Sequence, residues 1–183
     1  GVAHDVSASE EECFAKVKAL LEYLPSSFVD EVPNRSQPEH TVTPAKAGAQ
    51  NKTTWAFNES LDPGLRRDDS SPMFGYHEIS RIVPTNFNQA YNIKDVITDL
   101  VDTDSFFELQ STFAANIVTG LARMGGMTIG LVANQPAVKA GTIDIDASVK
   151  AARFIRFCDS FGIPIVSLVD TPGYLPGVEQ EHG

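Results

Sequence analysis

The hydrophobic positions of the chain divide it into three zones. In the first zone, apolar residues recur at helical spacing between Ser9 and Pro25, and Ser9 with Glu12 has the spacing of a capping box. Pro25 ends the pattern. The pattern predicts a helix that must bury one apolar stripe against another part of the molecule, and this stripe consists of Phe14, Val17, Leu20, Leu21 and Leu24.

The second zone, residues 33–72, shows no sustained period of apolar positions. It is rich in Asn, Ser, Thr and Asp, and five prolines interrupt it. This composition predicts a loop or a disordered linker. A connection of this length is unusual inside a compact domain, so it needs an explanation of its own.

The third zone, from about residue 81 onward, alternates helical and strand patterns. Residues 93–101 are typical of a short amphipathic helix, and residues 106–109 of a strand, although the latter could also close the helix. Residues 117–123 and 127–133 predict two strands of a hairpin. Gly125 and Gly126 lie between them and supply the positive φ angles that a tight turn needs.

A helix and a buried strand follow the hairpin. Asp144 or Asp146 is expected to cap a helix that runs to about Phe161, and Gly162 ends it. Residues 163–169 predict a strand buried on both faces. Strand, hairpin, helix and strand together predict an α/β fold. The residues of the helix expected to face the core are Val149, Ala152, Ile155, and Phe157 or Cys158.

The composition limits the classes of protein. The 183 residues suggest one domain or parts of two, and a hydrophobic content of 42% is enough for a core. A net charge of −10 disfavours a nucleic-acid partner. No apolar run reaches the roughly 18 residues of a membrane span, and no signal peptide precedes the first helix. Cys13 and Cys158 are interpreted as reduced core cysteines of a cytoplasmic protein.

The side chains offer no familiar catalytic motif. The sequences GxSxG, HExxH and GxxxxGK[ST] are absent, and the four histidines are scattered over different zones. We therefore expect neither a metal site nor a catalytic side chain. Lys150, Arg153 and Arg156 form a basic ridge, interpreted as a solvated face or, alternatively, as a contact for a phosphorylated ligand.

Two loops at predicted strand ends are the remaining candidates, because ligands bind at the carboxyl ends of strands in open α/β sheets. The loop of residues 170–177 is either a rigid turn or a device that aims backbone N–H groups at an oxyanion. In the loop of residues 133–141, Asn134 and Gln135 either hydrogen-bond a ligand or cap the strand end.

Long stretches of this sequence resemble one enzyme family. Residues 116–183, from NIVTGLARMGG to DTPGYLPGVEQEHG, are similar to the carboxyltransferase (beta) subunits of biotin-dependent acyl-CoA carboxylases, and in particular to propionyl-CoA carboxylase beta chains. The segment RIVPTNFNQAYNIKDVITDLVDTDSFFELQ and the opening GVAH helix that ends in YLP extend the resemblance. It covers about residues 1–35 and 73–183.

The resemblance implies a subunit built from crotonase-like lobes. Residues 1–32 would end the first lobe, residues 33–80 would be a linker, and residues 81–183 would begin the second lobe. Such subunits pass the carboxyl group of carboxybiotin, carried by a partner alpha subunit, to the α-carbon of an acyl-CoA such as propionyl-CoA. They form homo-oligomers and rely on two backbone oxyanion holes.

The resemblance also implies site residues, although none of them is catalytic. The oxyanion-hole glycines of the family would lie outside this chain, so the chain is expected to be inactive alone. Two alternatives stay open: a non-catalytic remnant or subunit-docking piece, and a biotin-dependent acyl-CoA decarboxylase. The acyl-CoA-binding candidates are Asn134, Gln135, Pro136 and Gly141, and the candidates in a loop facing the active site are Pro172, Gly173 and Tyr174.

The linker is longer than the family pattern leads one to expect. The excess at about residues 36–71 is similar to the translated product of a palindromic repeat element, and the alternative is an ordinary lengthened loop. An exposed linker tolerates such an insertion because the entropy cost of loop closure grows slowly with length.

Overall fold

The computed structural model describes residues 2–27, 29–35, 79, 81–86 and 89–182. They belong to one unit, formed by residues 1–37 and 75–183. Residues 38–74 are assigned to a second unit, which lies outside the described residues. The predicted insertion at 36–71 lies outside the described residues as well. Of the predicted linker, only residues 33–35 and 79 are described. The domain boundaries within residues 1–37 and 75–183 therefore stay predictions.

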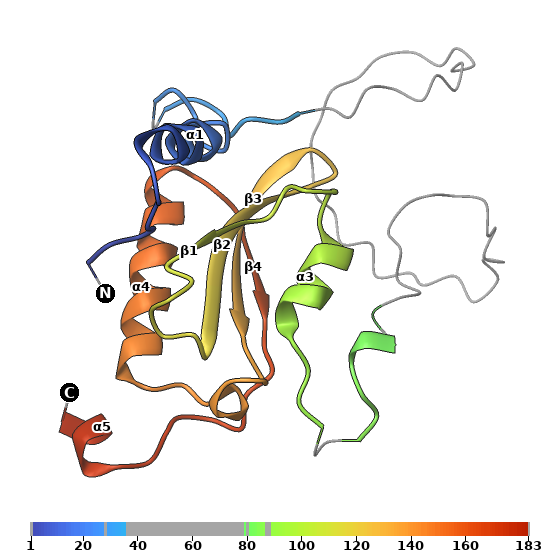
Figure 1. Ribbon diagram of the computed structural model, residues 1–183, viewed down its shortest axis with the longest axis vertical. Helices are drawn as coiled ribbons and strands as arrows, with labels where there is room; N and C mark the ends of the chain where they lie inside the picture. The colour runs from blue at the N-terminus through green and yellow to red at the C-terminus, as the bar shows by residue number, and fades with distance from the viewer. Residues whose placement is uncertain (1, 28, 36–78, 80, 87–88, 183) are drawn as a thin grey trace, which may run out of the picture. The chain divides into compact units, whose positions relative to one another are not determined.

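Three layers make up the described unit (Figure 1). A four-stranded sheet in the order β1-β2-β3-β4 has α3 on one face and α4 on the other. The strands are β1 (Phe107–Leu109), β2 (Ile117–Met124), β3 (Met127–Asn134) and β4 (Ile165–Leu168). The helices are α1 (Glu10–Leu21), α3 (Ile93–Leu100), α4 (Ile145–Ser160) and α5 (Val178–His182), with a 3₁₀ turn at Lys139–Gly141. The α/β prediction is confirmed.

The predicted hairpin is confirmed, with β2 antiparallel to β3 and a two-residue turn between them. Gly125 and Gly126 have φ angles of 61° and 83°. Their amides donate hydrogen bonds of 2.9 and 2.7 Å to the Asp102 carboxylate, so the turn is tied to the segment that follows α3. A Cβ on Gly126 would lie 2.0 Å from the carbonyl oxygen of Arg35. The backbone at residue 35 therefore packs directly against this turn.

Helix α4 begins and ends as predicted, but it turns a different face to the core. Asp144 caps it, accepting a hydrogen bond of 2.9 Å from the amide of Ala147. Val149 and Ile155, expected in the core, are 45% and 41% exposed. Ala152 is exposed as well. The buried residues are Ala147, Lys150, Phe154 and Cys158.

The side chain of Lys150 explains this difference, and the predicted basic ridge is wrong at this position. The residue is 1% exposed, and its amine donates hydrogen bonds of 2.8 Å to each of the carbonyl oxygens of Phe113 and Ile117. Burial lowers the pKa of Lys150 to about 8. A lysine that satisfies backbone carbonyls in the β1–β2 connection and at the first residue of β2 belongs to the core-facing side of α4.

Helix α1 has the predicted start but buries only the last part of its apolar stripe. Ser9 caps it by accepting a hydrogen bond of 3.2 Å from the amide of Glu12. Phe14 and Leu21 are 58% and 60% exposed, and α1 has no buried residue within the described part of the chain. The contact with the sheet comes from the end of the stripe: Leu20 and Leu24 are half-buried and pack against the core cluster on the α4 face, in which Tyr23 is buried.

Two smaller expectations also fail. Strand β4 was predicted to be buried on both faces, but it pairs with β3 alone among the described strands, and Ser167 within it is exposed. Cys158 is a buried free thiol as expected, whereas Cys13 is exposed on the surface of α1. The expectation of two core cysteines is therefore wrong for Cys13.

Candidate functional site

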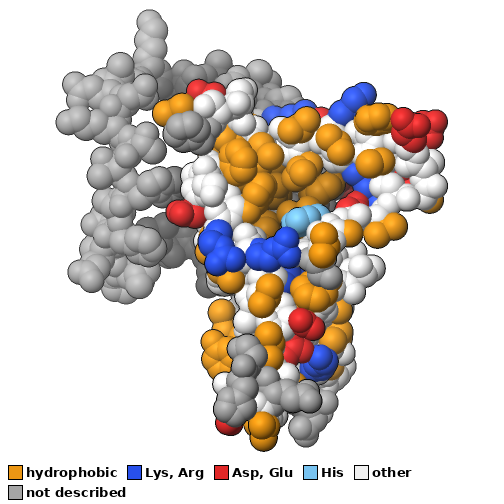
Figure 2. All heavy atoms as spheres, turned by 90° about the vertical axis from the view of Figure 1, so that its left-hand side faces the viewer, with side chains coloured by type: hydrophobic (Ala, Val, Ile, Leu, Met, Phe, Trp, Pro, Cys, Tyr) orange, Lys and Arg blue, Asp and Glu red, His pale blue; other side chains and the backbone are white. Residues whose placement is uncertain are grey.

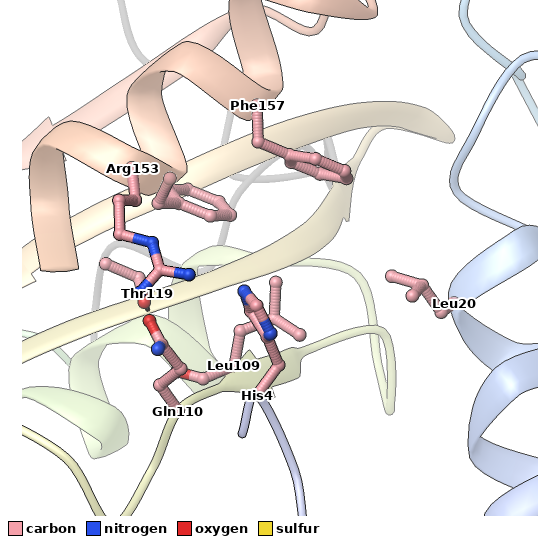
Figure 3. A pocket seen from close by; sticks show the side chains of 8 residues that line it. His4, Leu20, Leu109, Gln110, Thr119, Arg153 and Phe157 are labelled. Atoms are coloured by element: carbon pink, nitrogen blue, oxygen red, sulfur yellow. Dashed lines mark hydrogen bonds between the residues drawn. The ribbon is translucent and has the colours of Figure 1, made fainter. Parts of the chain in front are cut away.

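A cavity of about 360 Å³ lies on the α4 face of the sheet. Figure 3 shows Arg153, Gln110 and Thr119 pointing toward one another on one side of it, with His4 and Phe157 nearby. Figure 2 looks onto this side of the molecule and shows apolar side chains gathered around a histidine. This cavity, the α4-side pocket, contains none of the acyl-CoA-binding or loop candidates predicted from the sequence, but Arg153 of the predicted basic ridge lies in its wall.

A second cavity lies where β3 and β4 end. These two strands are parallel, so their carboxyl ends meet at one edge of the sheet, the place where open α/β sheets bind ligands. A cavity of about 520 Å³ occurs there, which we call the strand-end pocket. Its described lining residues come from the segment before α3 (Val83, Pro84, Asn86, Gln89, Ala90, Tyr91), the β3–α4 connection (Pro136, Ala140) and the segment after β4 (Asp170, Thr171, Pro172).

One hydrogen bond joins two of these segments across the strand-end pocket. The phenol of Tyr91 donates to Oδ2 of Asp170 over 2.7 Å. Burial, together with the hydrogen bond to Asp170 and the charge of that residue, raises the pKa of Tyr91 to about 12. Tyr91 was not a candidate in the sequence, since nothing in its neighbourhood indicates a partner 79 residues away.

Gly141, an acyl-CoA-binding candidate, brings the other two segments together. It is buried, has a φ of 72°, and an added Cβ would lie 2.4 Å from the carbonyl oxygen of Asp170. Only a glycine combines this left-handed conformation with such a close backbone approach. In the structure, Gly141 therefore fixes where the chain leaves β4.

Asn134 and Gln135 are both buried and both engaged by the protein. The side-chain amide of Asn134 donates to the carbonyl oxygen of Gly141 over 3.0 Å. Gln135 accepts a hydrogen bond of 3.1 Å from the amide of Ile93 and donates one of 2.6 Å to Oδ1 of Asn92. Of the two alternatives drawn from the sequence, these contacts match the capping of the strand end. Both side chains hydrogen-bond to residues that are adjacent in sequence to the lining of the strand-end pocket, Gly141 beside Ala140 and Asn92 beside Tyr91.

The loop at Pro172, Gly173 and Tyr174 is partly committed to internal contacts. Pro172 lines the strand-end pocket, whereas Tyr174 is 79% exposed and borders a neighbouring cavity. The amide of Gly173 donates to Oγ1 of Thr171 over 3.1 Å, and its carbonyl oxygen accepts from the amide of Ile143 over 3.0 Å. The Gly173 amide is thus already used in this conformation of the loop.

The charge of the strand-end pocket limits its ligands. Asp170 is acidic, and none of the described residues that line the pocket is basic. Nearby Lys139 is paired with Asp144 over 2.6 Å. Burial acts to raise the pKa of Asp144, but hydrogen bonds from Lys139 and from the amide of Ala147 outweigh it and lower the pKa. The pocket suits an uncharged group better than a phosphate.

The described residues contain neither a metal-site arrangement nor a membrane-spanning helix. No cluster of three or more His, Cys, Asp or Glu side chains there has the arrangement of a metal site. No helix in the same residues is both long enough and apolar enough to cross a lipid bilayer.

The described unit is thus a mixed α/β sheet with a cavity at the carboxyl ends of two parallel strands. The family follows from comparison with known sequences. The chain belongs to the carboxyl transferase domain family, whose model matches residues 1–183. The resemblance that the sequence predicted is confirmed, and the fold is that of a carboxyltransferase domain covered in part.

Relatives with known names share this family. The chain is 43% identical over 182 residues to the propionyl-CoA carboxylase carboxyltransferase subunit of Haloferax mediterranei, covering 100% of this chain and 29% of the relative. It is 39% identical over 183 residues to the methylmalonyl-CoA decarboxylase subunit alpha of Veillonella parvula, covering 100% and 30%. The chain therefore spans about 30% of the length of these curated relatives.

A solved structure supports the same assignment. The crystal structure of transcarboxylase 12S, described as a hexamer with hydrolysed methylmalonyl-coenzyme A bound, is similar with a TM-score of 0.75 and 36% identity. The match covers 98% of this chain and 29% of that one.

Proposed function

We propose that this chain contributes one wall of the site at which a biotin-dependent carboxyltransferase moves a carboxyl group from carboxybiotin to the α-carbon of an acyl-CoA. The observation that carries the proposal is the strand-end pocket. Its wall includes Asp170 and Pro172, at the start of the loop that the family resemblance assigns to the active site. Pro136, an acyl-CoA-binding candidate, lies on the same wall.

The roles of the candidates within this proposal follow from their contacts. Asn134, Gln135 and Gly141 act by holding the pocket together, because hydrogen bonds and a close backbone approach already engage them. Pro136 and Pro172 act as contact surfaces. Since no described lining residue is basic, the phosphates of coenzyme A would lie beyond the strand-end pocket, which takes an uncharged end of a substrate.

The partners and the substrate follow from the relatives. A propionyl-CoA carboxylase subunit among them favours propionyl-CoA as the acyl-CoA. Biotin would arrive on the carrier of a partner alpha subunit and not be attached to this chain. Transcarboxylase 12S assembles as a hexamer, which supports a homo-oligomer for the complete protein.

A chimeric enzyme tests the proposal. In the Haloferax carboxyltransferase subunit, the matching stretch is replaced by this chain, and the product is combined with the biotin-carrying partner. We expect carboxyl transfer to propionyl-CoA, with formation of methylmalonyl-CoA. A chimera that assembles and binds propionyl-CoA but forms no methylmalonyl-CoA overturns the proposal. The chain by itself should give no turnover, and activity from it alone would contradict its role as one wall.

A second candidate function comes from the Veillonella relative, whose identity to this chain is 39%. The same chimera, given methylmalonyl-CoA and free biotin, separates the two functions. Because the same carboxyl transfer runs in both directions, the chimera is also combined with the other subunits of each relative, and overall turnover only with those of the Veillonella enzyme would favour the decarboxylase.

A further inference from the structure

The buried amine of Lys150 lies among backbone carbonyl oxygens. It donates hydrogen bonds of 2.8 Å to each of the carbonyl oxygens of Phe113 and Ile117, and one of 3.4 Å to that of Ala114. An ammonium group has three N–H donors and no acceptor, so these three carbonyl oxygens match its full set of donors. The side chain therefore acts as a cation held within the β1–β2 connection, residues 110–116.

The β1–β2 connection has a backbone that needs support. Gln110 and Ala114 have φ angles of 54° and 44°. Residues other than glycine adopt such left-handed conformations at a cost, and keep them where surrounding contacts hold them. At Ala114 one of these contacts is the hydrogen bond from Lys150. A side chain without N–H donors at position 150 would remove hydrogen bonds from all three carbonyl oxygens and weaken this support.

Asn116 links the β1–β2 connection to the connection between β3 and α4. It is 2% exposed and lies between two residues whose carbonyl oxygens accept from Lys150. Its own carbonyl oxygen accepts a hydrogen bond of 2.9 Å from the amide of Gln135, and its side-chain amide donates one of 2.8 Å to the carbonyl oxygen of Thr142. The β3–α4 connection is thus tied to Asn116 at two places.

The segment between these two ties forms part of the strand-end pocket. Pro136 and Ala140 line the pocket, and the following residue, Gly141, lies against the carbonyl oxygen of Asp170. A series of hydrogen bonds and adjacent residues therefore connects the buried amine on α4 with both sides of this segment.

We infer that Lys150 is a positioning residue: through Asn116 it holds the β3–α4 connection where Pro136 and Ala140 form a wall of the strand-end pocket. The inference rests on the proposed function for the importance of this pocket. It assigns an effect on carboxyl transfer to a residue that is not among the described lining residues.

The protonation of Lys150 gives the inference a spectroscopic readout. Burial lowers the pKa of Lys150 to about 8, while the charge of Glu108 on β1 acts to raise it and that of Lys94 on α3 acts to lower it. Glu108 and Lys94 pair with each other over 2.7 Å. A neutral amine has only two N–H donors, so loss of the proton leaves one of the three carbonyl oxygens without its hydrogen bond.

The test uses the full chain, followed through its amide NMR signals, and the chimeric enzyme. Lys150→Met keeps the length of the side chain and removes the N–H donors, and Asn116→Ala removes the donor to Thr142. The matched control is Phe154→Leu, which changes the same buried face of α4 one turn further on.

A rescue experiment separates positioning from mere support of the fold. Lys150→Ala is supplied with n-propylammonium, which replaces the missing carbons and the amine. Tetramethylammonium carries the same charge without any N–H donor and serves as the control. We expect n-propylammonium to restore kcat/KM of the variant chimera, and tetramethylammonium not to do so.

Lys150→Met and Asn116→Ala should each shift the amide signals of residues 135–142, whereas Phe154→Leu should lower stability and leave these signals in place. In the chimera, each of the first two should lower kcat/KM for propionyl-CoA about tenfold. The double variant should lose no more than Lys150→Met alone, because both act through Asn116. In the wild-type chain, the Nζ signal of Lys150 and the amide signal of Gln135 should titrate with one midpoint, at about pH 8.

Other results overturn the inference. These are additive losses in the double variant, an equal loss of kcat/KM in Phe154→Leu, equal rescue by tetramethylammonium, or different midpoints for the two signals. The titration needs no variant, so it decides even where Lys150→Met fails to fold. A chimera without transfer, together with coupled signals in the full chain, removes the proposed function and leaves the inference standing. An active chimera in which Lys150→Met keeps the wild-type kcat/KM removes the inference alone.

Discussion

Replacement of Gly141 by alanine should destabilise the junction between the two loops of the strand-end pocket. The φ of 72° would place the new alanine in the left-handed region, where an L-residue loses roughly 1–2 kcal/mol. The added Cβ would lie 2.4 Å from the carbonyl oxygen of Asp170, and real Cβ atoms essentially never come within 3.0 Å of such a neighbour. That neighbour is backbone, so it cannot rotate away.

The expected loss follows from adding the two effects. Overpacking a buried position costs typically about 1–3 kcal/mol, so Gly141→Ala should lower the free energy of unfolding by about 2–5 kcal/mol. Gly162→Ala is the matched control. Its φ of 65° is similar, but an added Cβ there meets no atom within 4 Å. It should therefore cost only about 1–2 kcal/mol, the conformational part.

Urea unfolding of the two variants and the wild type, followed by circular dichroism, measures both losses. The reasoning is refuted when the two variants lose the same free energy of unfolding. It is also refuted when Gly141→Ala leaves the amide signals of residues 170–175 where they are in the wild type, because the clash must displace that segment.

Three further predictions concern the rest of the unit. Gly126→Ala should lower the free energy of unfolding more than Gly125→Ala does. An added Cβ on Gly126 would lie 2.0 Å from a backbone carbonyl oxygen, whereas one on Gly125 would meet no atom within 4 Å. Equal losses in the two variants would argue against the packing of the backbone at residue 35 on this turn. The pKa of Lys150 falls from its ordinary 10.5 to about 8, so the folded chain releases this proton before the unfolded chain does. Stability against urea should accordingly rise between about pH 8 and pH 10.5 through this group, and Lys150→Met should abolish that rise. Cys13 is exposed, whereas Cys158 is buried and burial raises its pKa to about 11. A thiol reagent should therefore modify only Cys13 in the native chain and both cysteines after unfolding. Fast modification of both cysteines in the native chain would contradict the fold.

Local signals in the sequence were enough to predict the hairpin and the boundaries of α4. Paired glycines mark the turn, and Asp144 and Gly162 mark the two ends of the helix. These signals work because each depends on a few adjacent residues, whose backbone conformation decides the element. The family resemblance could also be predicted from the sequence, because it rests on long uninterrupted segments of similar sequence.

Contacts between distant segments were beyond such reasoning. The sequence predicts Lys150 as part of a basic surface ridge. In the structure its amine is buried and donates to the carbonyl oxygens of Phe113 and Ile117, which no local pattern indicates. Tyr91 donates its hydrogen bond to Asp170, 79 residues further along the chain. The apolar stripe of α1 was predicted correctly as a pattern, but a pattern does not say what covers it.

The central claim is that the strand-end pocket, and not the α4-side pocket, belongs to the carboxyl-transfer site. The most direct test compares kcat/KM for propionyl-CoA in the chimeric enzyme after one substitution in each cavity. Asp170→Ala changes the strand-end pocket, and His4→Ala changes an exposed side chain of the α4-side pocket. We predict a loss of about tenfold or more for Asp170→Ala and wild-type kcat/KM for His4→Ala. Full activity in Asp170→Ala together with a loss in His4→Ala would contradict the claim.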